Sequence, residues 1–358
     1  MKERVIKVAI VSIGNCCSSL VQAVEAAKQG DIGTDGLSHP DLAGYKPEHI
    51  DFVAAFDIDT RKVGKDLSEA IFSAPNCTTK YFNVSNQGCV VSLGRLEDGI
   101  AAHMEGVFSA DKKAQDVSED QVIDVLKSSS AEILVSYLPV GSHKAAEFYA
   151  RAAAKAGCAF VNCMPTPLAN NAEIVKLYES ARLPLLGDDI KSQIGSTSIH
   201  RALIDILEKK GVTIQRTYQL NIGGNTDFMN MRNPDRSSSK KHTKESSLNH
   251  LFSNATELDV GPSDYVSQLK DHKVGYINVE GVGLMGMPFS IEMKLKVEDS
   301  PNSAGIVINA IRTARVALDR KIKGVVMDAC PWLFKNPPEK LSEDDVFTVF
   351  ENFFKGQV

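Results

Sequence analysis

Short apolar runs alternate with amphipathic stretches through the first half of the chain. The run VIKVAIV (5–11) is β-branched and largely apolar, which is typical of a buried strand in a parallel sheet. The turn SIGNCCSS follows it, and then LVQAVEAAKQG, which places its apolar residues on one helical face. Gly30 is the expected end of that helix. The chain therefore opens with a strand, a turn and a helix.

The same alternation continues to about residue 200. HIDFVAAFDID (49–59), AEILVSYLP (131–139), CAFVNCMP (158–165) and LPLLGDDI (183–190) are each predicted to be strands. An alanine-rich helix is expected to run through Ala156 and to stop at Gly157, and another helix is expected near 171–182. Strands that alternate with helices predict a doubly wound parallel α/β sheet.

The pattern changes after about residue 212. TIQRTYQLNIGG predicts a strand, and the polar stretch 233–248 follows it, with RSSSKKHTK (236–244) reading as a surface loop. VGYINVEGVG and PFSIEMKLKVED then alternate apolar and polar residues, as antiparallel strands with one buried face do. From residue 302 the periodicity is helical again. We predict an α+β domain (201–301) inserted into the first domain (1–200 and 302–358).

Length and charge narrow the class of protein. The chain has 358 residues, enough for roughly two domains. The formal net charge of −5 does not favour a nucleic-acid partner. The seven cysteines include no C-x-x-C pair, which argues against a disulfide framework or a zinc knuckle. The apolar run near the N-terminus is too short to span a membrane. We expect a cytoplasmic protein without membrane partners.

The first strand–turn–helix is where a dinucleotide-binding fingerprint belongs. Its three glycine positions fall on Ser12, Gly14 and Cys17, so that only the middle glycine is present. Asp57 ends the second strand, where an acid that binds the cofactor ribose is expected, although it lies 43 residues after Gly14. The alternative interpretation of Asp57 is an ordinary carboxylate in a turn.

Two further stretches are rich in small and polar residues. GDDIKSQIGSTSIH (187–200) places Gly195, Ser196 and Thr197 at a helix start, which suits either a phosphate ester or a routine helix cap. NIGGNTDFMN (221–230) puts two glycines, three asparagines and Asp227 at the end of a strand, where a tight turn is the alternative explanation. Lone lysines such as Lys273 and Lys335 are solvated by default.

Taken together, these stretches resemble the myo-inositol-1-phosphate synthase family in its shorter bacterial and archaeal form. The resemblance covers nearly the whole chain and rests on VAIVSIGNCCSSL, GDDIKSQIGST, NIGGNTDFMNM, SKKHTK, DSPNSAG and WLFKNPP. It implies a Rossmann-type NAD-binding domain with an inserted catalytic and tetramerisation domain. It also implies an isomerase that converts D-glucose 6-phosphate to 1L-myo-inositol 1-phosphate with NAD regenerated in each cycle.

The resemblance implies a chemical sequence that requires mobile protons. The C5 hydroxyl is oxidised, the resulting ketone enolises at C6, C6 attacks the C1 aldehyde, and C5 is reduced again. Lysines suit these steps because burial among cations lowers the pKa of an ammonium group. Catalytic roles are implied for Lys240, Lys244, Lys273, Lys335, Asp189 and Asp299. Within this set we expect Asp189 to relay a proton with Lys240 and Asp299 to be the counter-ion of Lys335.

Binding residues are implied in the same way. The cofactor set is Gly14, Asn15, Cys16, Asp57, Ser136, Asp188 and Asp227. The set for the substrate phosphate is Lys191, Gly195, Ser196, Thr197 and Lys244. A divalent metal ion, held by Asp227, Asp299 and phosphate oxygens of the substrate or cofactor, is a further expectation without an assigned identity.

Two other functions remain as alternatives. An NAD-dependent sugar-phosphate dehydrogenase with net NADH production would share the fold. A catalytically silent NAD-binding regulatory protein would be expected to lack the lysines, and all four are present. We expect a homotetramer, with the alternating strands of the inserted domain packed between subunits.

Overall fold

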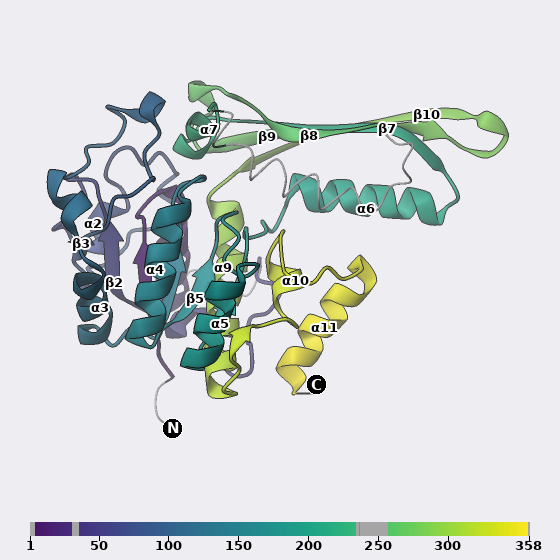
Figure 1. Cartoon of the computed structure of the whole chain (residues 1–358). Coiled ribbons are helices and arrows are strands. Elements are labelled where there is room, and N and C mark those ends of the chain that lie inside the picture. The colour runs from purple at the N-terminus through teal and green to yellow at the C-terminus, as the bar shows by residue number, and fades with distance from the viewer. Residues whose placement is uncertain (1–3, 31–35, 234–235, 237–256, 357–358) are drawn as a thin grey trace.

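The computed structural model describes residues 4–30, 36–233, 236 and 257–356. They form two sheets of unequal character (Figure 1). The larger sheet contains seven strands in the order β11-β6-β5-β4-β1-β2-β3, and every neighbouring pair is parallel. Its strands are β1 (Ile6–Val11), β2 (Ile50–Asp57), β3 (Val91–Leu93), β4 (Ile133–Ser136), β5 (Ala159–Asn162), β6 (Pro184–Leu186) and β11 (Gly324–Val325). The predicted doubly wound α/β fold is confirmed.

Helices cover both faces of this sheet. Their bounds are α1 (Asn15–Gln29), α2 (Leu67–Ala70), α3 (Glu119–Ser128), α4 (His143–Ala156), α5 (Ala172–Ala181), α9 (Pro301–Asp319), α10 (Cys330–Leu333) and α11 (Glu343–Lys355). Helices α1 and α4 end where the sequence predicts, because Gly30 and Gly157 adopt the left-handed conformation at their C-caps. Helix α9 carries the chain back from the second sheet and packs on the same face as α1.

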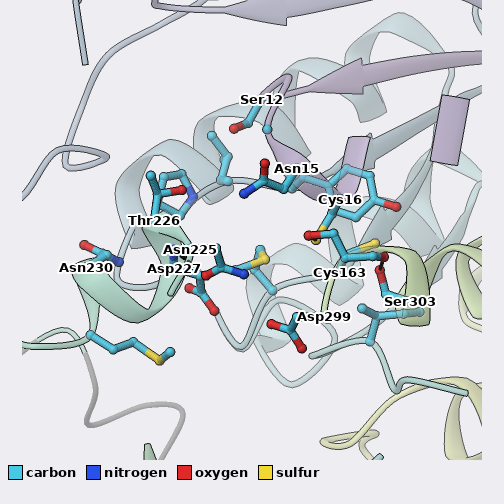
Figure 2. A pocket seen from close by; sticks show the side chains of 18 of the residues that line it. Ser12, Asn15, Cys16, Cys163, Asn225, Thr226, Asp227, Asn230, Asp299 and Ser303 are labelled. Carbon is cyan, nitrogen blue, oxygen red and sulfur yellow. Dashed lines mark hydrogen bonds between the residues drawn. The ribbon is translucent and has the colours of Figure 1, made fainter. Parts of the chain in front are cut away.

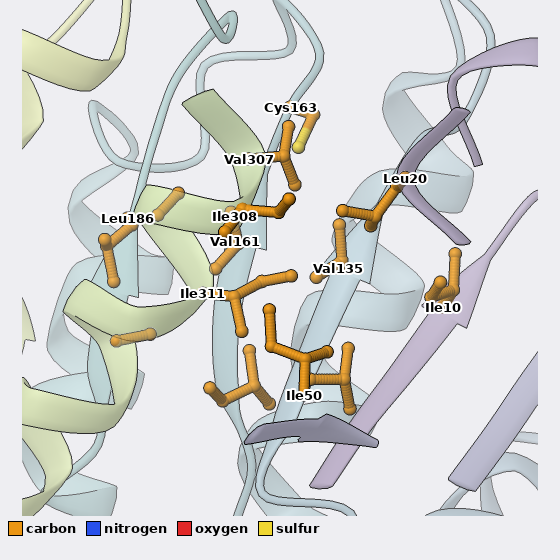
Figure 3. Close-up of a cluster of buried hydrophobic side chains, with 14 of the residues drawn as sticks. Ile10, Leu20, Ile50, Val135, Val161, Cys163, Leu186, Val307, Ile308 and Ile311 are labelled. Atoms are coloured by element: carbon orange, nitrogen blue, oxygen red, sulfur yellow. The ribbon is translucent and has the colours of Figure 1, made fainter. Parts of the chain in front are cut away.

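The core has two layers because side chains alternate across each strand. Ile10, Val135 and Val161 face Leu20 of α1 and Ile311 of α9 (Figure 3). The neighbouring residues of the same strands point to the opposite face of the sheet, where they pack against α3, α4 and α5. Buried on both faces, these strands show the continuous apolar pattern from which the parallel sheet was predicted.

The second sheet has four strands in the order β10-β9-β7-β8. They are β7 (Thr213–Gly223), β8 (Glu257–Tyr265), β9 (His272–Val282) and β10 (Pro288–Glu298), with helices α6 (Ser196–Lys209) and α7 (Thr226–Asn230) beside them. Helix α6 lies along one face of this sheet (Figure 1). The antiparallel pairing of β7, β9 and β10 is as predicted, but β8 pairs parallel to β7, so the sheet is mixed.

The inserted arrangement follows from this topology. The chain leaves the large sheet after β6, builds the second sheet, and returns through α9 to β11, which pairs with β6. The limits 1–200 with 302–358, and 201–301, remain our proposal for the two domains, although α6 crosses the first limit. None of the helices in the described ranges combines the length and apolar character needed to cross a bilayer.

Candidate active site

A large cavity opens at the carboxyl ends of the parallel strands, where the second sheet meets the first. Its walls come from the ends of β1, β2, β4 and β5, the start of α6, the α7 segment and the stretch that follows β10 (Figure 2). Ligands of doubly wound proteins bind at this edge of the sheet. Segments far apart in the sequence therefore contribute to one site.

The turn after β1 forms one end of the cavity. Ser12 has a φ of 72°, a left-handed value that the fingerprint normally assigns to glycine, and its N–H donates to Phe56 O at 2.8 Å. At Gly14 a Cβ would meet no other described atom within 4 Å, because this position faces the open cavity. The third fingerprint residue, Cys17, is fully buried in the core. The turn thus keeps the fingerprint's shape with only one of its glycines.

Helix α1 presents its N-terminus to the cavity. Asn15 and Cys16 line it, and the first N–H groups of any helix have no acceptor within that helix. Such a terminus, combined with the open Gly14, fits the pyrophosphate of a dinucleotide. Burial raises the pKa of the Cys16 thiol to about 12, so this group is neutral at physiological pH.

Asp57 lies at the same end of the cavity, as predicted. Its Oδ2 accepts from Ile13 N at 2.7 Å, and its Oδ1 accepts from Asp59 N at 2.9 Å. The side chain of Lys62, which is only 3% exposed, comes within 3.9 Å of Oδ2. Asp57 therefore shapes the turn, and each carboxylate oxygen keeps a lone pair that can accept from a ribose hydroxyl.

Lys335 and Asp189 form the first of two ion pairs at the cavity. Lys335 Nζ lies 3.0 Å from Asp189 Oδ1, and Asp189 is 4% exposed at its side chain. The backbone holds the pair together, because Lys335 N donates to Asp189 O at 2.7 Å and Lys191 N donates to Leu333 O at 2.9 Å. Asp189 Oδ2 is buried without a hydrogen-bond partner among the described residues.

Lys273 and Asp299 form the second pair. Lys273 Nζ donates to Asp299 Oδ1 at 3.0 Å, and both side chains are 20% exposed. The register of β9 against β10 places Lys273 opposite Val297, which brings the two residues together. The expected pairing of Asp299 with Lys335 is therefore wrong, because Asp299 pairs with Lys273 and Lys335 pairs with Asp189.

The start of α6 forms the other end of the cavity. Gly195 is the N-cap of α6, and Ser196 and Thr197 begin the helix, as predicted. Ser196 Oγ is buried and has no hydrogen-bond partner in the described ranges. Lys191 lines the same end, and its Nζ donates to Pro331 O at 2.8 Å. A helix N-terminus with a buried unused hydroxyl and a nearby cation suits a phosphate group.

Not every expected residue reaches the cavity. The Asp188 carboxylate is fully buried and accepts from Asn162 Nδ2 at 2.7 Å and from Ala169 N at 3.0 Å. Burial raises the pKa of Asp188 to about 7. Neither Asp188 nor Ser136 belongs to the lining, whereas Asp227 does. Lys240 and Lys244 lie outside the described residues.

The cavity also contains residues that the motifs did not single out. Asn225 caps α7 by accepting from Asp227 N and Phe228 N, so the stretch after β7 is a capped helix, not a hairpin turn. Tyr137 reaches the lining with a buried hydroxyl that no described residue binds. Lys62 is the third such residue. The density of amides in NIGGNTDFMN pointed to Asn225, whereas nothing in the sequence distinguished Lys62 from a solvated lysine.

The structure does not confirm the expected divalent metal ion. Within the described ranges no three histidine, cysteine, aspartate or glutamate side chains are gathered so that they could hold an ion. Asp299, one of the two expected ligands, is already paired with Lys273. We assign no step to a metal below.

Comparison with known sequences places the chain among named enzymes. Residues 195–300 match the model of the myo-inositol-1-phosphate synthase family. An inositol-3-phosphate synthase of Mycolicibacterium smegmatis is 44% identical over 361 residues, which cover 98% of each chain. One from Corynebacterium glutamicum is 43% identical over 354 residues, which cover 96% of each chain.

Solved structures agree with the architecture. The protein Ari2 superposes with a TM-score of 0.81 at 33% identity, over 99% of both chains. A myo-inositol-1-phosphate synthase-related protein from Thermotoga maritima gives a TM-score of 0.79 at 22% identity, over 98% of both chains. At 22% identity, the similarity to the Thermotoga maritima protein supports the fold alone.

Proposed function

The chain belongs to the myo-inositol-1-phosphate synthase family, and on that premise we propose how its own residues carry out the reaction. The chain converts D-glucose 6-phosphate to 1L-myo-inositol 1-phosphate, which is the same compound as 1D-myo-inositol 3-phosphate. The observation that carries the residue assignment is the presence of two lysine–aspartate pairs, Lys335–Asp189 and Lys273–Asp299, at one cavity. One pair serves oxidation and reduction at C5, and the other serves ring closure.

NAD, when bound, takes a hydride from C5 of the open-chain sugar and returns it to C5 after the ring has closed. We assign its binding to the turn at Gly14, the N-terminus of α1 and Asp57. The open Gly14 and the unused N–H groups of α1 support this assignment. Asn15, Cys16 and Asp227 stay in the proposed set because they line the cavity, whereas Ser136 and Asp188 do not line it.

Lys335 is assigned to the C5 oxygen. As C5 is oxidised, its hydroxyl proton passes to Lys335 while Lys335 gives a proton to Asp189, and both transfers run in reverse when the C5 oxygen is re-formed as a hydroxyl. Asp189 orients the amine and, through its unused Oδ2, offers a place to which a proton can move. The expected relay between Asp189 and Lys240 stays a prediction, because Lys240 lies outside the described residues.

Lys273 is assigned to the C1 oxygen. The C5 ketone acidifies C6, which loses a proton to the phosphate dianion that the substrate itself carries on C6. C6 then attacks the C1 aldehyde, so that a carbon–carbon bond forms and negative charge develops on the C1 oxygen. The Lys273 ammonium stabilises this charge and donates the proton that makes the C1 hydroxyl. Asp299 holds Lys273 in place at 3.0 Å.

The start of α6 is assigned to the substrate phosphate. Gly195, Ser196 and Thr197 supply N–H and hydroxyl donors, and Lys191 supplies positive charge. Lys244 completes this group in our proposal, and Lys240 joins Lys335 at the C5 oxygen. Holding the phosphate at one end of the cavity fixes where C5 and C1 lie relative to the two ion pairs.

One incubation distinguishes the proposed isomerase from the alternative function, a sugar-phosphate dehydrogenase with net NADH production. The enzyme is given glucose 6-phosphate and NAD, the products are identified by NMR, and NADH absorbance is followed. We expect inositol phosphate to accumulate without NADH. Steady NADH accumulation with no inositol phosphate would favour the dehydrogenase.

A homotetramer is part of the proposal. The face of the second sheet opposite α6 carries Tyr218, Leu220 and Tyr276, each about two-fifths exposed, which would be buried against another copy. Light scattering at micromolar concentration should give four times the mass of the chain; a monomer would contradict it. The cytoplasmic location, and the lack of nucleic-acid and membrane partners, stay predictions from the sequence.

A further inference from the structure

Lys62 is a buried cation to which neither the motifs nor the proposed chemistry gives a role. It follows β2, is 3% exposed and lines the cofactor end of the cavity. Its Nζ donates to Ile13 O at 2.7 Å and to Asn76 Oδ1 at 3.1 Å. Removing an ammonium group from water is costly, so a lysine at such a position needs an explanation beyond packing.

Side chains hold both peptide groups that flank Ile13, the one shared with Ser12 and the one shared with Gly14. The N–H of Ile13 donates to Asp57 Oδ2 at 2.7 Å, and its carbonyl accepts from Lys62 Nζ and, at 3.0 Å, from Asn76 Nδ2. Asn76 is fixed in turn because its Nδ2 also donates to Ile71 O at 2.8 Å. Three side chains thus hold the two consecutive peptide groups on either side of Ile13, in the turn after β1.

The first of these peptide groups adjoins Ser12, the one residue of the turn with an unfavourable conformation. Ser12 holds a φ of 72°, which a residue with a Cβ adopts reluctantly and glycine adopts freely. Rotation at Ser12 would turn the Ser12–Ile13 peptide group away from Asp57, and by moving Ile13 it would also displace the carbonyl that Lys62 and Asn76 bind. The clamp on Ile13 and the left-handed Ser12 depend on each other.

We propose that Lys62, with Asn76, is a positioning residue for the turn after β1, to which we assign the cofactor. By keeping Ser12 left-handed, Lys62 compensates for the absence of the first glycine of the fingerprint. Gly14 and the N-terminus of α1 then face the cavity in the geometry that a pyrophosphate requires. The effect on cofactor binding rests on the proposed use of NAD, whereas the coupling between Lys62 and Ser12 does not.

The first test measures binding of NAD to the full-length enzyme by calorimetry, beside steady-state kinetics. Lys62→Met should weaken NAD binding by about tenfold or more, while KM for glucose 6-phosphate stays the same. Adding Ser12→Gly to Lys62→Met should recover most of the loss, because glycine keeps the turn without the clamp. Lys65→Met, three residues away at an exposed lysine that donates to Ser73 Oγ, is the matched control and should bind NAD normally.

The second test needs no ligand. A double-mutant cycle of Lys62→Met and Ser12→Gly in urea unfolding should show that Ser12→Gly is more stabilising in the Lys62→Met background than in the wild type. Asn76→Ala, which removes one donor without removing a buried charge, should couple to Ser12→Gly in the same direction and serves if Lys62→Met does not fold.

The possible results distinguish the clamp on Ile13 from a direct contact between Lys62 and the cofactor, and both from a failure of the proposed function. Additive effects of the two substitutions on unfolding would overturn the clamp, and so would wild-type NAD affinity in Lys62→Met. An undiminished loss of affinity in the double variant would mean that Lys62 contacts the cofactor itself. If the wild type fails to bind NAD, the proposed function fails, and the unfolding cycle still decides the clamp.

Discussion

Lys335 Nζ lies 3.0 Å from Asp189 Oδ1, although 146 positions separate the two residues in the sequence. Their backbones also pair, with Lys335 N donating to Asp189 O and Asn336 N donating to Asp188 O. The motifs GDDIK and WLFKNPP are therefore joined by backbone hydrogen bonds, and these bonds set the position of the Lys335 amine. A rigid backbone frame is what proton transfer at a fixed substrate oxygen requires.

Lys335→Met should abolish most of the activity while leaving the fold intact. Because the C5 oxygen loses its proton acceptor and donor, kcat should fall by roughly a hundredfold to ten-thousandfold. The measurement is the rate of inositol phosphate formation at saturating substrate. Lys323→Met, at an exposed lysine on the way to β11, is the matched control and should retain wild-type kcat. Equal activity of the two variants would remove Lys335 from the chemistry.

Lys273→Ala should separate oxidation from ring closure. The variant loses the group assigned to the C1 oxygen but keeps Lys335 and Asp189, so C5 can still be oxidised. Rapid mixing with glucose 6-phosphate should give reduced cofactor in proportion to enzyme, with no inositol phosphate. Lys296→Met, at an exposed lysine of β10, should behave as the wild type. Cyclised product at the wild-type rate in Lys273→Ala would contradict the assigned role.

Gly14→Ala should weaken NAD binding without weakening the fold. The added methyl group meets no other described atom within 4 Å and projects into the cavity. We expect about a tenfold higher Kd for NAD by calorimetry and a change in Tm of less than about 2 °C. Gly261→Ala is the control, since a Cβ there is equally free but lies outside the cavity. Unchanged NAD affinity in Gly14→Ala would place the pyrophosphate elsewhere.

Gly275→Ala should act on the opposite end of the site. A Cβ there would lie 2.6 Å from Ser196 Oγ and 3.3 Å from Ser196 Cβ, so the start of α6 must move away from β9. KM for glucose 6-phosphate should rise several-fold while the Kd for NAD stays the same. The opposite pattern, a weakened NAD site with normal KM for the sugar, would contradict the placement of the phosphate at α6.

His200 should make stability depend on pH. It is fully buried between α6 and β7, with Nε2 2.7 Å from Thr217 Oγ1. Burial lowers its pKa to about 4 from the ordinary 6.5. A lowered pKa means that the unfolded chain binds the proton first, so this contribution is complete above pH 6.5 and is lost as the pH falls towards 4. The loss amounts to about 3 kcal/mol.

The measurement is urea unfolding of the wild type and of His200→Gln at several pH values. The comparison matters because Asp188, with its raised pKa of about 7, gives a slope of the opposite sign in both proteins. The difference in unfolding free energy between wild type and His200→Gln should shrink as the pH falls from about 6.5 to about 4. A constant difference would show that His200 does not titrate in this range.

The sequence predicted those helices and strands that are marked by residues within the element itself. The strands of the large sheet are buried on both faces and carry continuous apolar runs, and Gly30 and Gly157 mark helix ends through their own backbone conformation. Helices α3 and α11 were not predicted, since α3 follows a long irregular stretch and α11 follows the proline-containing segment after Lys335. The parallel pairing of β8 was also missed, because it depends on a partner distant in the sequence.

The site was predicted as a set of residues but not as a set of contacts. The motifs named both lysines and both aspartates of the two ion pairs, yet they paired Asp299 with Lys335. The register of β9 on β10 and the hydrogen bonds between 188–191 and 333–336 decide the pairing, and neither is written in a single motif. Lys62 was missed for the same reason, because its proposed role depends on a hydrogen bond to the carbonyl of Ile13, which lies 49 positions away in the sequence.

The most direct test of the whole account uses glucose 6-phosphate deuterated at C5, incubated with the enzyme and a catalytic amount of NAD. Because the hydride leaves C5 and returns to it within one cycle, the inositol phosphate should keep the deuterium at that carbon, and product should far exceed the cofactor. Deuterium recovered in free reduced cofactor, with none in an inositol phosphate, would contradict the central claim that this cavity oxidises, closes and re-reduces one sugar.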